Sequence, residues 1–126
     1  MARILVRVGD EEFEGELTED TAPQTVQKIL DVLPLEATTN TWGEEIYFEI
    51  PVEMGEENSK ETVSKGDLGY WPSGSAFCIF YGITPMSQNE QDIVPASPVN
   101  PIGRIENAEA LKKHGAGETI HVSLAE

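Results

Sequence analysis

Apolar side chains recur at every second position in several short runs, and this alternation constrains the fold more than any other feature. A period of two is typical of β-strands that turn one face to a core and the other to solvent. The alternating sets are Ile4, Val6 and Val8; Phe13, Gly15 and Leu17; Ile46, Phe48, Ile50 and Val52; and Ile120, Val122 and Leu124. The turn residues Gly9 and Asp10 join the first two sets, so the sequence predicts a mostly β protein that begins with a hairpin.

The segment 68–83 differs from these runs because it is apolar on both faces. Its alternating residues are Phe77, Ile79 and Tyr81 on one side and Cys78 and Phe80 on the other. Strands covered on both faces have this composition. We therefore expect a central hairpin, with its turn at Pro72-Ser73-Gly74.

Two segments carry helix signals. Thr21 is placed to cap a helix that ends before Pro34, with an apolar stripe at Val26, Ile29, Leu30 and Leu33. Asn107 is placed to cap a second, short helix before the last strand. The prolines between Thr84 and Pro101 predict a long irregular loop of the kind that is often functional.

These elements amount to two helices and six to eight strands in 126 residues, a length typical of one domain. Antiparallel strands in this number commonly remove their edges by closing into a barrel. We predict a single domain over residues 1–126, folded as a closed antiparallel β-barrel capped by two short helices.

Composition excludes several functions. The chain has 8 Lys and Arg against 23 Asp and Glu, a net charge of −15 that repels nucleic acid and anionic membranes. No apolar run approaches the ~20 residues of a membrane span, and the N-terminus has no signal-peptide pattern. One cysteine and two separated histidines do not form a zinc site. We expect a cytoplasmic protein with no cofactor and no metal.

Four motifs, in order between residues 42 and 103, resemble a known family. They are Trp42–Phe48, Gly66–Pro72, Ala76–Gly82 and Asn100–Gly103. They look like the small prokaryotic cyclophilin-like family, which is related in fold to the cyclophilin peptidyl-prolyl isomerases. The resemblance implies the same capped barrel that the alternation predicts.

The resemblance also identifies the residue on which isomerase activity would depend. Those enzymes lower a barrier of roughly 18–20 kcal/mol about the prolyl peptide bond, with an arginine near the amide nitrogen. Their arginine ends a Phe-His-Arg strand, and the matching segment here is Tyr47-Phe48-Glu49. A carboxylate at Glu49 would oppose the same transition state, so efficient isomerase activity is not expected.

The remaining functional candidates are aromatic residues and Glu49, which we expect to form a ligand-binding groove with the Thr84–Pro101 loop as its rim. The predicted groove residues are Tyr47, Glu49, Tyr70, Trp71, Phe80 and Tyr81. The leading hypothesis is a module that binds a peptide segment or a small molecule. The alternatives are a peptidyl-prolyl isomerase with a rearranged site, and an assembly role in which an aromatic patch is buried between subunits. The catalytic residues and the oligomeric state stay unknown.

Overall fold

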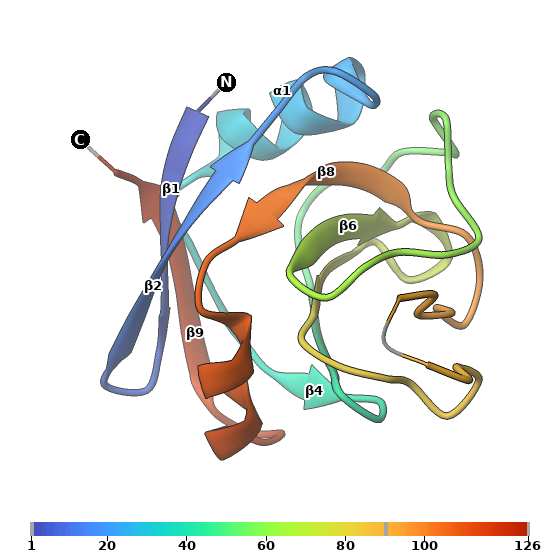
Figure 1. Cartoon of the computed structure of the whole chain (residues 1–126). Coiled ribbons are helices and arrows are strands. Elements are labelled where there is room, and N and C mark those ends of the chain that lie inside the picture. Colours follow the sequence, from blue (N-terminus) through green and yellow to red (C-terminus); the bar gives the residue numbers. More distant parts are fainter. Residues whose placement is uncertain (1, 90, 126) are drawn as a thin grey trace.

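The chain forms a nearly closed antiparallel barrel in a computed structural model that describes residues 2–89 and 91–125 (Figure 1). Its described strands are β1 (Ala2–Val8), β2 (Glu11–Leu17), β3 (Leu35–Thr38), β4 (Asn40–Thr41), β5 (Glu45–Glu49), β6 (Asp67–Trp71), β7 (Ala76–Phe80), β8 (Asn100–Ile105) and β9 (Thr119–Leu124). They are hydrogen-bonded in the order β3-β9-β1-β2-β8-β6-β7-β5-β4. The predicted mostly β barrel is confirmed.

The opening hairpin follows from its sequence. Strands β1 and β2 pair from Ala2 opposite Leu17 to Val8 opposite Glu11. Gly9 makes the turn with a φ of +58°, in the left-handed region that favours glycine. The alternating apolar residues of both strands face the barrel interior, where Ile4, Val6 and Val8 are fully buried.

The central hairpin is covered on both faces, as its sequence predicts. Phe77 and Ile79 of β7 belong to the main core inside the barrel. Cys78 and Phe80 point outward into a second apolar cluster that also contains Val63, Ile93 and Val99. The outward cluster is covered by irregular chain, which is joined by isolated bridges between Lys60 and Val99 and between Val63 and Ile93.

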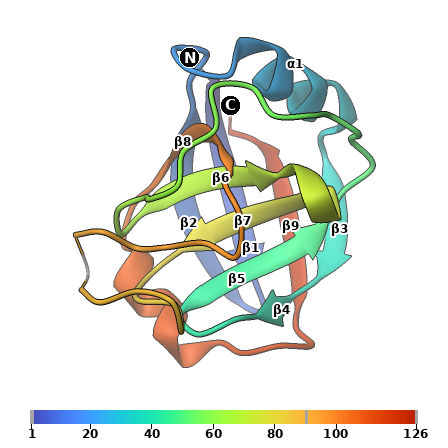
Figure 2. The same ribbon diagram turned by 90° about the vertical axis from the view of Figure 1, so that its right-hand side faces the viewer.

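The described residues form one α-helix and two 3-10 helices, of which the shorter, η1 (Pro72–Gly74), lies in the turn between β6 and β7. The other two helices lie at opposite ends of the barrel (Figures 1 and 2). Helix α1 (Pro23–Val32) packs Val26 and Ile29 against the core, and the 3-10 helix η2 (Ala108–Lys113) contributes Leu111. The predicted cap of α1 is wrong, because its N-cap residue is Ala22 and not Thr21. Asn107 is the N-cap residue of η2, as predicted, but it has a left-handed φ of +60° and makes no side-chain capping bond. At α1 the reason is that another segment supplies the acceptor, the carboxylate of Glu57, which binds the Gln24 and Thr25 N–H groups.

The remaining differences concern short or irregular strands. The sequence analysis did not predict β3 and β4, which pair with β9 and β5 at the two ends of the strand order. Strand β5 ends at Glu49, although Ile50 and Val52 beyond it are still buried. No helix among the described residues is long and apolar enough to cross a membrane.

Candidate functional site

A row of small side chains on the outer face of the barrel leaves room for a pocket. On this face Tyr47 of β5 lies opposite Cys78 of β7, and Cys78 lies opposite Gly69 of β6. In the next row Glu49 and Trp71 lie on either side of Ala76. Figure 2 looks onto this face, where β5, β7 and β6 run side by side. The bulky side chains of Tyr47 on β5 and Trp71 on β6 therefore flank the smaller side chains of Cys78 and Ala76 on β7.

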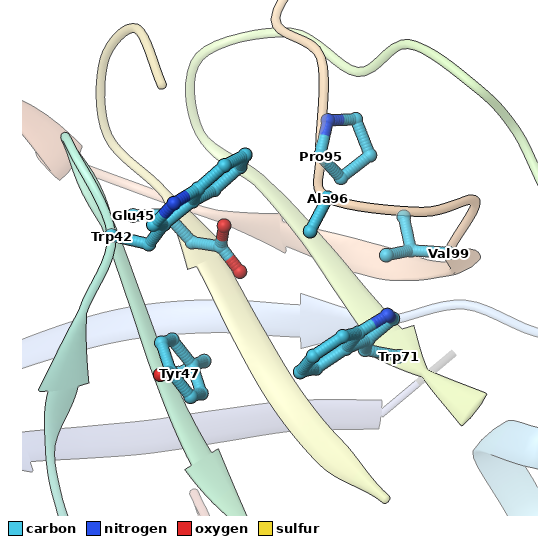
Figure 3. A pocket seen from close by; sticks show the side chains of 7 residues that line it. All are labelled: Trp42, Glu45, Tyr47, Trp71, Pro95, Ala96 and Val99. Carbon is cyan, nitrogen blue, oxygen red and sulfur yellow. The ribbon is translucent and has the colours of Figure 1, made fainter. Parts of the chain in front are cut away.

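On this outer face, between the strands and the long loop, lies a cavity of about 170 Å³, which we call the aromatic pocket. It is lined by Trp42, Glu45, Tyr47, Trp71, Pro95, Ala96 and Val99. Figure 3 shows Trp42, Tyr47 and Trp71 around the space, with the Glu45 carboxylate pointing between them and Pro95 and Ala96 opposite Trp42. The lining is apolar apart from one carboxylate and the polar ends of the aromatic rings.

A tight turn brings Trp42 and Glu45 to the same side of the pocket. The Trp42 N–H donates to the Glu45 carbonyl at 3.0 Å, and the Glu45 N–H donates to the Trp42 carbonyl at 3.2 Å. Gly43, with a φ of +60°, is the first central residue of this two-residue hairpin turn. A Cβ at Gly43 would lie 2.7 Å from Cδ of Pro85, so both the backbone conformation and the close approach require glycine.

On the other side of the pocket, Trp71 of β6 contacts the long loop. The Tyr47 and Trp71 rings meet edge to face, with centroids 6.1 Å apart and an interplanar angle of 82°. The indole N–H of Trp71 donates to the Ser97 hydroxyl. Val99 lies against Gly69, and a Cβ added at Gly69 would come within 2.9 Å of Cγ2 of Val99. These contacts hold the loop over the sheet.

Glu45 is the only acidic residue among the described residues of the lining, and it is almost completely buried, with 5 % of its surface exposed. Burial raises the pKa of its carboxyl to about 7, against a weaker opposing effect of a hydrogen bond from the Cys78 thiol. Burial, followed by the nearby Glu45 charge, raises the pKa of Cys78, so this thiol is not activated. Among the described lining residues none carries a positive charge.

The structure separates the six predicted groove residues. Tyr47 and Trp71 line the pocket, whereas Glu49 is exposed on the same face outside the lining. Tyr70 points into the barrel, where its hydroxyl donates to the Val52 carbonyl at 2.6 Å. Tyr81 is also in the main core, and Phe80 lies in the outward cluster, fully buried. The six therefore do not open into one cleft.

The sequence analysis missed most of the lining. Glu45 could have been found, because it has the same strand parity as Tyr47 and must face the same way. Trp42 precedes a hairpin turn whose register the sequence does not fix. Pro95, Ala96 and Val99 belong to the long loop expected to be the rim, but their positions depend on tertiary contacts that no local pattern reports.

The three arginines lie away from the aromatic pocket. Arg3 pairs with Glu14 at 2.6 Å on the opening hairpin, and Arg104 pairs with Asp67 and donates to the Lys65 carbonyl. Arg7 is exposed on β1, where it lies opposite Glu12 of β2 in the opening hairpin. No group of three or more His, Cys, Asp or Glu side chains in the described part of the chain is arranged to hold a metal ion.

Comparison with known proteins agrees with this architecture. The family model described as Cyclophilin-like matches residues 2–123. The chain belongs to this cyclophilin-like family. The cyclophilin-like protein is also similar to a hypothetical protein from Archaeoglobus fulgidus, whose structure was determined in solution. The two are 47 % identical with a TM-score of 0.83, over 98 % of this chain and 95 % of that one. The search of curated proteins found no match.

Proposed function

We propose that this cyclophilin-like protein is a binding module whose aromatic pocket takes one group of a peptide or of a small molecule. The observation that carries the proposal is the pocket itself, a concave apolar surface with a single inward carboxylate. Ligand sites in proteins have this composition, with mostly apolar walls and a few polar groups that orient the ligand.

The size of the pocket limits what it can hold. Sites for drug-sized molecules usually measure about 300–1,000 Å³, and the aromatic pocket measures about 170 Å³. An engineered cavity of ~150 Å³ holds one benzene molecule. The pocket therefore suits one side chain or one end of a larger ligand, and the rest of a larger ligand would lie outside the pocket.

The electrostatics of the pocket do not support efficient prolyl isomerisation. Twisting the prolyl amide needs a donor or a positive charge at its nitrogen, in a preorganised position. Here the described lining offers Glu45 and no guanidinium, and Arg3, Arg7 and Arg104 lie elsewhere. In a protease-coupled assay on prolyl peptides we expect a rate equal to that of buffer. A clear catalysed rate would replace the binding module with an isomerase whose site is rearranged.

Intrinsic fluorescence is a direct test of binding, because Trp42 and Trp71 are the two tryptophans of the chain and both line the pocket. We expect the emission to shift when short peptides or small aromatic and aliphatic molecules are titrated in. Ala96→Phe, at an exposed lining position, would fill the pocket from the loop and abolish the shift.

A matched control is Ala116→Phe, which adds the same ring at an exposed position outside the pocket. It should keep the shift. If no probe changes the emission, and Ala96→Phe instead alters the sedimentation of the protein, the pocket belongs to an assembly interface and the proposal fails.

A further inference from the structure

We propose that the aromatic pocket binds an alkylated ammonium group, with Trp42, Tyr47 and Trp71 as its cage and Glu45 as its counter-ion. The inference rests on the proposed binding function and adds the chemical class of the ligand. It follows from three properties of the pocket: the arrangement of its rings, a carboxylate with no cationic partner among the described lining residues, and its apolar character.

The rings supply the attraction. The face of an aromatic ring carries a partial negative charge that attracts a cation lying within about 6 Å of it, most strongly for tryptophan. Trp42, Tyr47 and Trp71 stand on three sides of one small space (Figure 3), and the near-perpendicular Tyr47 and Trp71 rings meet at its edge. A single small cation there would contact several rings at once.

The carboxylate supplies the charge. A buried carboxylate is costly unless a cation or hydrogen-bond donors compensate it. Glu45 faces the space between the rings, and the described lining contains no lysine, arginine or histidine that could pair with it. The Cys78 thiol lies beside it and forms a hydrogen bond with it, but a thiol does not neutralise the charge. A ligand cation would provide the partner that the protein does not, and the net charge of −15 would favour its approach.

The apolar walls decide between kinds of cation. A primary ammonium, such as that of lysine, is a compact and strongly hydrated charge that loses much hydration on burial. Alkyl groups on the nitrogen reduce that cost and add contacts with the rings and with Pro95 and Val99. A quaternary methylammonium group also suits a cavity of about 170 Å³.

The first test compares two ligands of the same shape that differ in charge. Choline and 3,3-dimethylbutan-1-ol are isosteres, with a positive nitrogen in one and a neutral carbon in the other. We expect calorimetric titration at pH 8 to show at least tenfold tighter binding of choline. Equal binding of the two would overturn the inference and leave the binding function intact. If neither binds, the inference also fails, and the fluorescence screen with its Ala96→Phe variant decides the binding function separately.

The second test uses a matched pair of variants on one strand. Glu45→Gln removes the inward carboxylate while keeping its shape, and Glu49→Gln removes an exposed carboxylate two residues further along the same face. We expect Glu45→Gln to weaken choline binding at least tenfold, with little effect on the neutral isostere. Glu49→Gln should stay within twofold of the parent. An equal loss in both variants would mean that choline responds only to the overall negative charge, which contradicts the inference.

A third titration identifies the source of the ammonium group. A short peptide with one trimethyllysine would bind more tightly than choline if the natural ligand is a modified side chain. Binding no tighter than that of choline would assign the site to a free small cation. Loss of peptide binding in Glu45→Gln is expected in either case. Peptide binding that Glu45→Gln leaves unchanged would overturn the assignment of Glu45 as counter-ion.

Discussion

Glu45 couples the pocket to the stability of the fold. Its carboxyl ionises near 4.5 in an unfolded chain and near 7 in the folded protein, because burial disfavours the charged form. Between these pH values the folded state keeps a proton that the unfolded state has released. The free energy of unfolding therefore falls as pH rises from about 4.5 to 7, by roughly 3 kcal/mol from this group.

We expect Glu45→Gln to remove this fall in the free energy of unfolding between pH 4.5 and about 7. Urea unfolding of the parent and the variant, measured from pH 4.5 to 8, should show the variant gaining stability relative to the parent over this range. Glu49→Gln, on the exposed part of the same strand, should follow the parent. Parallel pH profiles for the parent and Glu45→Gln would contradict a Glu45 carboxyl whose pKa is raised by burial.

At the scale of single residues the candidate site was only partly predictable. The aromatic composition identified Tyr47 and Trp71 as lining residues. It could not separate them from Tyr70, since adjacent strand residues face opposite ways and the sequence does not state which face carries the site. Tyr81 lies beyond the end of β7 and is in the core. The loop residues were out of reach because their places depend on contacts such as that of Val99 with Gly69.

The elements are joined by a partly buried polar network at the start of helix α1. The Glu57 carboxylate accepts the N–H groups of Gln24 and Thr25 at 3.1 and 2.9 Å and the Thr25 hydroxyl at 2.8 Å. Asn100, fully buried at the start of β8, accepts the Glu57 N–H and donates to the Thr25 hydroxyl and the Gly55 carbonyl. The network ties the helix, a loop and a strand together.

We expect Asn100→Ala to cost about 2–3 kcal/mol, because it leaves buried partners without their hydrogen bonds. Glu57→Gln keeps an oxygen acceptor but loses the charge at the positive end of the helix, and we expect a smaller cost of about 1 kcal/mol. Chemical denaturation measures both. Ser59→Ala, in the same loop outside this network, is the control. Equal effects of all three variants would show that the network does not stabilise the junction.

A second junction, between η2, β2 and the segment before β9, contributes a stability that depends on pH. His114, at the end of η2, binds Glu11 of β2 through Nε2 and Glu118 through Nδ1, each at 2.9 Å. Burial lowers the pKa of His114, but the hydrogen bonds to Glu11 and Glu118 outweigh it and raise the pKa above its usual 6.5. The stability contribution is therefore complete below pH 6.5 and is lost as pH rises through the raised folded value.

Melting temperatures of the parent and His114→Gln test this junction. We expect the difference between them to be largest below pH 6.5 and to shrink as the imidazolium deprotonates. His121→Gln removes the other histidine, which is exposed on β9. The melting temperature of this control should stay close to that of the parent, because the side chain that it changes is exposed. A difference between the parent and His114→Gln that stays constant across this range would rule out a charged His114 in the fold.

Helices and strands with a strong local sequence pattern were predictable. Strands that form only because they pair with a neighbouring strand were not. Alternation located β1, β2, β5 and β9, the segment apolar on both faces located the hairpin of β6 and β7, and the apolar stripe located α1. The short strands β3 and β4 carry no such pattern and are defined by their pairing with β9 and β5. The cap of α1 was mistaken because its acceptor comes from Glu57, more than thirty residues further along the chain.

For the molecule as a whole, the excess of negative charge destabilises the folded state. The 23 acidic residues outnumber the 8 basic ones, so most carboxylates have no basic side chain with which to pair. Exposed ion pairs such as Arg3–Glu14 contribute little by themselves, about 0–1 kcal/mol. The remaining carboxylates repel one another more strongly in the compact barrel than in the expanded unfolded chain.

Salt should therefore stabilise the protein by screening this repulsion. The screening length falls from about 30 Å at 0.01 M to about 10 Å at 0.1 M, which is short on the scale of the whole barrel. At pH 7.5 we expect the melting temperature to rise by several degrees over this range of sodium chloride, and to change much less between 0.1 and 0.5 M. Near the isoelectric point the net charge vanishes, and the same salt series should have little effect. A rise of equal size at both pH values would assign the stabilisation to a general effect of salt on apolar burial, because only mutual repulsion of the carboxylates depends on their ionisation.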